Sequence, residues 1–82
     1  MKRKASLPWR KVDDEGIVLS DNKDEAHILN ESALMIWEML DGQSSSEMIA
    51  RRLSREYEIP EKIALRDVKK FLKELRVRGL VE

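Results

Sequence analysis

The first third of the chain carries short apolar runs that are separated by polar turns. Trp9–Val12 and Gly16–Ser20 each have the composition of a strand, and the turn-like DDEG that begins at Asp13 connects them. The polar connection DNKD, residues 21–24, then leads to EAHIL, which alternates weakly and ends before Asn30. This pattern predicts a meander of three antiparallel strands.

The period of the pattern becomes helical after Leu29. Asn30 is a good N-cap because its side-chain oxygen can accept a first-turn amide hydrogen, and Glu31 places negative charge at the positive end of the helix dipole. We therefore expect a helix from Glu31 to Leu40, with Gly42 as its C-terminal stop. The core-facing positions of this helix, at i, i+3, i+4 and i+7, are Ala33, Ile36, Trp37 and Leu40.

Two further helices are predicted in the second half. Ser44 and Glu47 match a capping box, so a helix is expected to begin there and to end before Pro60. Another is expected from Glu61 to Arg78, with Gly79 after it. The core-facing residues are Ile49, Leu53 and Tyr57 on the former and Ala64, Val68, Phe71, Leu72 and Leu75 on the latter, and Leu80 and Val81 should pack back onto them. The order β-β-β-α-α-α predicts an α+β fold.

Chain length limits the organisation to one domain over residues 1–82, in which residues 1–7 are expected to be an exposed, flexible tail. The absence of cysteine excludes disulfides and thiolate metal sites and suggests a reducing compartment. The longest apolar stretches, Ala33–Trp37 and Ile17–Leu19, are far shorter than the roughly 20 residues that cross a bilayer. We expect a cytoplasmic protein that does not contact membranes.

Charge argues against a nucleic-acid partner. The 16 basic and 16 acidic side chains give a formal charge of zero, whereas nucleic-acid binders usually carry surplus cations that displace phosphate counterions. Residues 60–82 are mildly basic, but the strand region is acidic and would repel a phosphate backbone. The acids of that region are Asp13, Asp14, Glu15, Asp21, Asp24 and Glu25.

Residues suited to catalysis are scarce. His27 is the single histidine, and there is no cysteine to act beside it. A lone histidine cannot form a typical zinc site, and the acids Asp13–Glu15 lack the glycine spacing of a calcium loop, so we interpret them as a solvated turn. We predict a protein that is not an enzyme and has neither a cofactor nor a metal, with His27 in a structural or peptide-contacting role.

Three motifs resemble one family of proteins. They are LN at residues 29–30, IWEMLDG at residues 36–42 and the spaced DV, FL, L and GLV of residues 67–81, and together they look like the PqqD-like family over about residues 16–82. The resemblance implies a small winged-helix module that recognises the leader of a ribosomally synthesised, post-translationally modified precursor peptide. It also implies a separate modifying enzyme as partner, such as a radical SAM protein, a leader peptidase or another tailoring enzyme.

The mechanism that the resemblance implies is β-strand addition. The leader would pair with the edge strand of Glu25, Ala26, His27, Ile28 and Leu29 and lie beside the third helix, where Ile63, Asp67, Lys70, Phe71 and Glu74 would contact it. The simpler alternative for Asp67, Lys70 and Glu74 is a solvated helix face with pairs at i,i+3 and i,i+4. Phe71 lies at the boundary of this face, and such a residue belongs to the core more often than it contacts a peptide.

A second reading of the same helix remains open. A winged-helix DNA-binding or transcriptional protein would place the cations of the third helix on phosphates. Those cations are Arg66, Lys69, Lys73 and Arg76. Since an unpaired strand edge can also join two copies of a chain, we predict a monomer or weak dimer.

Overall fold

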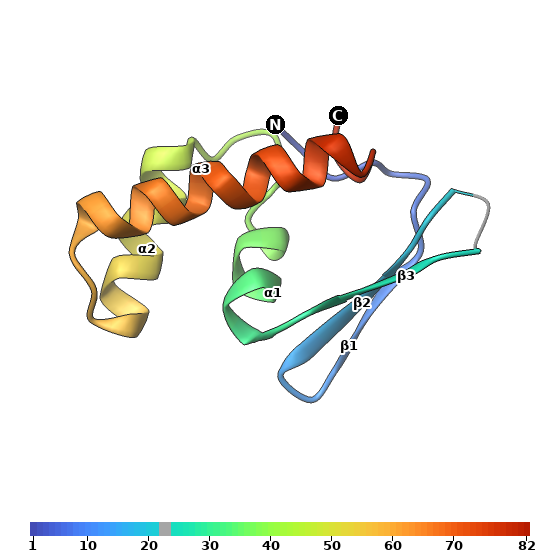
Figure 1. Cartoon of the computed structure of the whole chain (residues 1–82), viewed down its shortest axis with the longest axis horizontal. Coiled ribbons are helices and arrows are strands. Elements are labelled where there is room, and N and C mark those ends of the chain that lie inside the picture. The colour runs from blue at the N-terminus through green and yellow to red at the C-terminus, as the bar shows by residue number, and fades with distance from the viewer. Residues whose placement is uncertain (22–23) are drawn as a thin grey trace.

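The computed structural model describes residues 1–21 and 24–82, and in these ranges three strands precede three helices (Figure 1). Two residues of the expected DNKD connection, 22 and 23, lie outside the described residues. No helix of the described ranges is both long and apolar enough to cross a bilayer. The predicted α+β order is confirmed. The elements are β1 (Trp9–Val12), β2 (Glu15–Leu19), β3 (Ala26–Leu29), α1 (Glu31–Glu38), α2 (Ser46–Tyr57) and α3 (Glu61–Val77).

The three strands form an antiparallel sheet in the order β1-β2-β3. The register pairs Val18 with His27 and Ile17 with Ile28. Because side chains alternate between the two faces of a sheet, Val18 and Leu29 share the face that packs on the helices, and both are buried. Ile28 points to the other face and is 62% exposed.

Gly16 allows helix α1 to lie close against strand β2. A Cβ atom at this position would stand only 2.7 Å from Cδ1 of Leu34, which is a buried residue of α1. Gly16 is paired with Leu29, the last residue of β3, so the close contact occurs where the chain leaves β3 and enters α1. The sheet and the first helix are thereby held together at the end of β3.

The core lies between the inner face of the sheet and the helices, and α2 and α3 pack along each other. Trp37 of α1 is fully buried and meets Trp9 edge-to-face, with ring centroids 6.2 Å apart. Most predicted core positions are confirmed as buried: Ile36, Trp37, Leu40, Ile49, Leu53, Ala64, Val68, Leu75, Leu80 and Val81. Ala33, Phe71 and Leu72 are only half-buried, and Tyr57 is 38% exposed.

The helix ends differ from expectation at three places, the smallest difference being that α3 ends at Val77 rather than Arg78. Helix α1 ends at Glu38 rather than Leu40, although Asn30 caps it as predicted by accepting the N–H of Ala33 at 2.9 Å. Helix α2 is capped by the hydroxyl of Ser45, which accepts the N–H of Met48 at 3.1 Å, so the predicted capping box from Ser44 is wrong.

The physical reason for the shifted start of α2 is a turn that is closed by Asp41. Its carboxylate accepts the backbone N–H groups of Gln43 at 2.9 Å and Ser44 at 3.1 Å. Ser44 is thereby held in the turn, and the helix begins one residue later. The same hydrogen bonds, first from Gln43 and then from Ser44, lower the pKa of Asp41 below its ordinary value.

Residues 1–7 do not form the expected exposed tail. The backbone of Lys2 forms an isolated antiparallel β-bridge with Asp41, and that of Arg3 forms another with Val81. The two ends of the chain therefore lie side by side (Figure 1). The guanidinium of Arg3 donates to the carbonyl oxygens of Trp37 at 2.8 Å and Glu38 at 2.9 Å, which lie at the end of α1. The sequence concealed this because its local pattern has no strand or helix period, and the partners lie more than thirty residues away.

Candidate peptide-binding site

The outer edge of β3 offers backbone hydrogen bonds that no described strand uses. The N–H of Ser20 donates to the carbonyl of Glu25 at 3.0 Å, which identifies this as a hydrogen-bonded pair. Such pairs alternate with non-bonded pairs in an antiparallel ladder, so β3 bonds to β2 through His27 and Leu29. The N–H and C=O groups of Ala26 and Ile28 therefore point toward the open edge.

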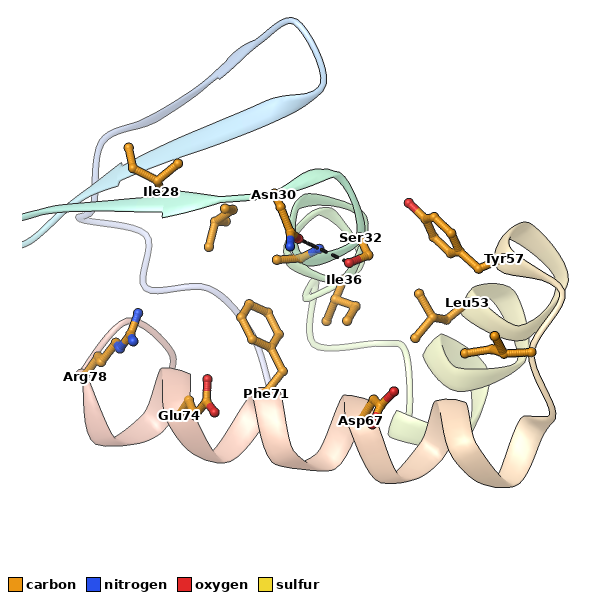
Figure 2. Close-up of a pocket in the computed structure, with 13 residues that line it drawn as sticks. Ile28, Asn30, Ser32, Ile36, Leu53, Tyr57, Asp67, Phe71, Glu74 and Arg78 are labelled. Atoms are coloured by element: carbon orange, nitrogen blue, oxygen red, sulfur yellow. Dashed lines mark hydrogen bonds between the residues drawn. The ribbon is translucent and has the colours of Figure 1, made fainter.

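A groove runs along this edge between β3 and α3, and it has two sections that share Ile28 and Arg78. The first section holds about 500 Å³ and extends over the start of α1 to the end of α2. The second section holds about 610 Å³ beside the first half of β3. Figure 2 shows Phe71, Glu74 and Arg78 rising from α3 toward β3, with Ile28 on the far side of that strand.

The first section has an apolar floor. Ile36 and Leu53 are buried there, Ile59 and Phe71 are half-buried, and Tyr57 stands at the end of α2 (Figure 2). Apolar surface of this kind, next to unused backbone hydrogen-bonding groups, suits an extended peptide whose side chains alternate between solvent and pocket.

Charged groups line the rim of the groove, and acids predominate among the described residues. Asp67 and Glu74 come from α3 and Glu25 from the approach to β3, whereas Arg78 supplies a positive charge where the two sections meet. Asp67 lies 3.8 Å from Arg66, an exposed contact that contributes little to stability.

Tyr57 is held at the end of the groove by a hydrogen bond across elements. Its hydroxyl donates to the carboxylate of Glu31 at 3.2 Å. Partial desolvation of the ring, followed by this carboxylate, raises the pKa of Tyr57 above its ordinary value. The hydroxyl therefore stays protonated and available as a donor throughout the physiological pH range.

Comparison with known protein families assigns the sequence that builds this groove to one family. The family model described as "Coenzyme PQQ synthesis protein D (PqqD)" matches residues 15–81. The chain belongs to the PqqD family. No curated protein sequence matches it.

Two solved structures resemble this PqqD family member over nearly its whole length. One is described as TbiB1 in complex with the TbiA(beta) leader peptide, with a TM-score of 0.89, 26% identity, and coverage of 100% of this chain and 95% of that chain. The other is described as lasso peptide synthetase B1 complexed with the leader peptide, with a TM-score of 0.87, 23% identity, and coverage of 99% and 95%. The second likeness concerns the fold alone.

Eight of the ten residues predicted for the site line the groove. Ile28, Leu29, Asp67, Phe71 and Glu74 border its first section, and Glu25, Ala26 and His27 border the second together with Ile28. Ile63 and Lys70 border neither section. Lys70 directly precedes Phe71 and so lies about 100° around the helix from it, and Ile63 belongs to the first turn of α3. The contacts of all ten with a peptide stay a prediction.

The sequence reading missed the contribution of α2 and of the helix ends. The sequence pattern assigns Leu53 and Tyr57 to the core and Arg78 to the end of a helix, and it gives Ile59 no role. The available signal was Tyr57 itself, an aromatic residue at the end of the predicted helix and three residues before Pro60. Their meeting with Phe71 depends on how α2 packs against α3, which local periodicity does not specify.

The groove contains little that could act as a catalyst. His27 faces the inner side of β3, is half-buried, and has an Nε2 atom without a hydrogen-bond partner among the described residues. No three His, Cys, Asp or Glu side chains gather as a metal-binding group in residues 1–21 and 24–82. The described residues of this surface offer hydrogen bonding and apolar contact.

Proposed function

We propose that this protein binds the leader segment of a ribosomally synthesised precursor peptide and delivers it to a separate modifying enzyme. The observation that carries the proposal is the open edge of β3, whose outward backbone groups on Ala26 and Ile28 face a groove walled by α3. Membership of the PqqD family and the likeness to TbiB1, which was solved with a leader peptide, support it.

The leader adds to β3 as a fourth strand. Leader residues opposite Ala26 and Ile28 exchange backbone hydrogen bonds with them and point their side chains to the outer face, where Ile28 is exposed. The residues between point inward, to the groove that Phe71, Glu74 and Arg78 border. Backbone bonds thus contribute affinity, and the groove selects alternate side chains.

The role of the protein is binding rather than catalysis. By holding the leader and the enzyme together, it raises the effective concentration of the precursor at the enzyme, which needs no reactive group of its own. A radical SAM enzyme and a leader peptidase both fit this role. We place the protein in the cytoplasm, where ribosomes make precursor peptides.

The proposal is tested by calorimetric titration with the leader segment of any short precursor peptide encoded beside this protein. Wild-type protein should bind one leader per chain with a Kd between nanomolar and low micromolar. Ile28→Pro removes the outward N–H without breaking a bond to β2, and we expect a loss of affinity of at least about 30-fold.

The matched control is the same change on the other edge of the sheet. The N–H of Leu19 donates to the carbonyl of Pro8 at 3.0 Å, so the alternation of pairs turns the N–H of Lys11 outward from β1. Lys11→Pro should leave leader affinity within about twofold. Unchanged binding by a folded Ile28→Pro variant would refute strand addition at β3.

We propose a monomer or weak dimer in solution. Two open edges could pair copies of the chain, yet each offers only a four-residue strand. Sedimentation at nanomolar concentration should give the mass of one chain, and a tight dimer there would contradict this.

A further inference from the structure

Helix α3 carries a row of cations on the side away from the groove. The row is Lys62, Arg66, Lys69, Lys73 and Arg76, spaced by four and three residues, and all five are exposed. At about 100° of rotation per residue, this row lies nearly opposite the groove-lining row of Asp67, Phe71, Glu74 and Arg78. The groove and the hollow beside these cations share one lining residue, Val77, so a partner that binds the cations leaves the rest of the groove open.

Part of the cationic row borders an apolar hollow. Met1, Leu72 and Val77 line a depression of about 510 Å³, and Lys69, Lys73 and Arg76 stand around it. Val77 is 79% exposed, which is more than any other large apolar side chain of the described residues. We call these six residues the Lys69 surface. Its apolar centre with a charged rim is the usual anatomy of a protein interface.

The cations of the Lys69 surface lack partners within the described part of the protein. Lys69, Lys73 and Arg76 have no acidic side chain within 4.0 Å there, whereas Arg66, next along the row, contacts Asp67. The acids of α3 at positions 67 and 74 are turned toward the groove. A partner that brings carboxylates would therefore meet uncompensated positive charge.

We propose that the Lys69 surface docks an acidic, partly apolar segment of the modifying enzyme while the leader occupies the groove on the other side of α3. The identity of this partner rests on the proposed function. Carboxylates of the segment pair with Lys69, Lys73 and Arg76, and its apolar side chains cover Leu72, Val77 and Met1. Such complementarity mainly accelerates association and weakens as salt increases.

A protein segment fits this surface better than a nucleic acid does. Phosphates would pair with the cations but would leave the apolar centre formed by Met1, Leu72 and Val77 uncovered. The chain also has a formal charge of zero, so it lacks the cation surplus that drives counterion release from a duplex.

The test uses full-length protein and the purified modifying enzyme that is encoded with the same precursor peptide. Lys69→Glu/Lys73→Glu reverses two charges at positions i and i+4. Arg51→Glu/Arg55→Glu makes the same charge change at the same spacing on α2, where both residues are exposed. Enzyme binding is measured by interferometry at low and high salt, and leader binding by calorimetry on the same samples.

We expect Lys69→Glu/Lys73→Glu to weaken enzyme binding at least about tenfold at low salt, with leader affinity within twofold of wild type. The control should weaken enzyme binding less than threefold. Equal enzyme affinity for wild type and both variants, or no enzyme binding by wild type, would overturn the docking site even if the leader binds normally.

Two further outcomes separate this proposal from others. If the leader does not bind but enzyme binding depends on Lys69 and Lys73, the proposed function fails and the docking surface stands. If duplex DNA of about 20 base pairs binds wild type and loses affinity in Lys69→Glu/Lys73→Glu, while the enzyme does not bind, the surface belongs to nucleic acid and the docking site is overturned.

Discussion

The two edges of the sheet have the same backbone but different surroundings. Strand β1 has four exposed residues and a shallow hollow of about 140 Å³, lined by Pro8, Trp9, Arg10, Ile17 and Leu19. Strand β3 opens onto a groove whose sections hold about 500 and 610 Å³ and are walled by α3. Each edge turns two residues outward, so the supply of backbone hydrogen bonds is equal.

The difference teaches that an open edge alone does not make a recognition site. Backbone groups pair with any extended chain, and selectivity comes from pockets that accept alternate side chains. At β3 these pockets are built by helices packed on the inner face of the sheet. At β1 the helical contacts are smaller: Trp9 packs on Trp37, and Lys11 borders a hollow of about 210 Å³ with residues of α1 and α2. We therefore expect only weak and unselective pairing there.

Among the changes that test the difference between the two edges, removing the aromatic floor of the groove should have the largest effect, a loss of leader affinity. Phe71→Ala deletes a half-buried ring between Asp67 and Glu74, and we expect leader affinity to fall by about 10- to 100-fold. Leu72→Ala is the matched control, because Leu72 is also half-buried on α3 but lines the hollow of the Lys69 surface instead of the groove. Calorimetry should find its leader affinity within threefold of wild type, and equal losses in both variants would indicate general destabilisation instead.

A smaller effect, on stability rather than binding, is expected near β1. The guanidinium of Arg3 bonds two carbonyl oxygens at the end of α1 and lies 5.6 Å from the ring centroid of Trp9. Arg3→Ala should lower the free energy of unfolding by about 1–3 kcal/mol, measured by urea denaturation, and leave leader affinity unchanged.

Lys2→Ala provides the control for Arg3→Ala. Its ammonium lies 4.0 Å from an exposed carboxylate of Glu82, a contact that contributes ~0–1 kcal/mol. A loss of leader binding in Arg3→Ala would contradict the separation of the two edges.

The smallest effect should be a pH dependence at the β3 side. The pKa of Tyr57 is raised in the folded protein, so its contribution to stability is complete below the unfolded pKa of about 10 and is lost as pH rises through the folded value. In Tyr57→Phe, the free energy of unfolding should fall less steeply between about pH 9 and 11 than in wild type, as measured by urea denaturation at several pH values. An unchanged slope would mean that the hydrogen bond to Glu31 does not persist in solution.

Local sequence signals predicted most elements. The peptide site at the edge of β3 was implied by the family resemblance and stays a prediction, and no local signal indicated which residues of α2 line the groove beside it. The Asn30 cap, the apolar stripe around Trp37 and the glycine after α3 were all found, because each depends on residues within one or two turns. Gly79 has a φ of +73° after the helix, as a C-terminal glycine should. The start of α2 was misplaced because Asp41, from outside the helix, holds Ser44 in a turn.

By itself, the sequence determined the α+β order, the helical faces and the family to which the motifs point, since hydrophobic period and capping act over short distances along the chain. Only the tertiary structure decided that Tyr57 and Ile59 join Phe71 in one groove, that Arg78 lies where its two sections meet, and that the first residues brace the end of α1. These features join Ile28 with Arg78 and Arg3 with Trp37. Such contacts form when elements pack on a shared core, so no local pattern encodes them.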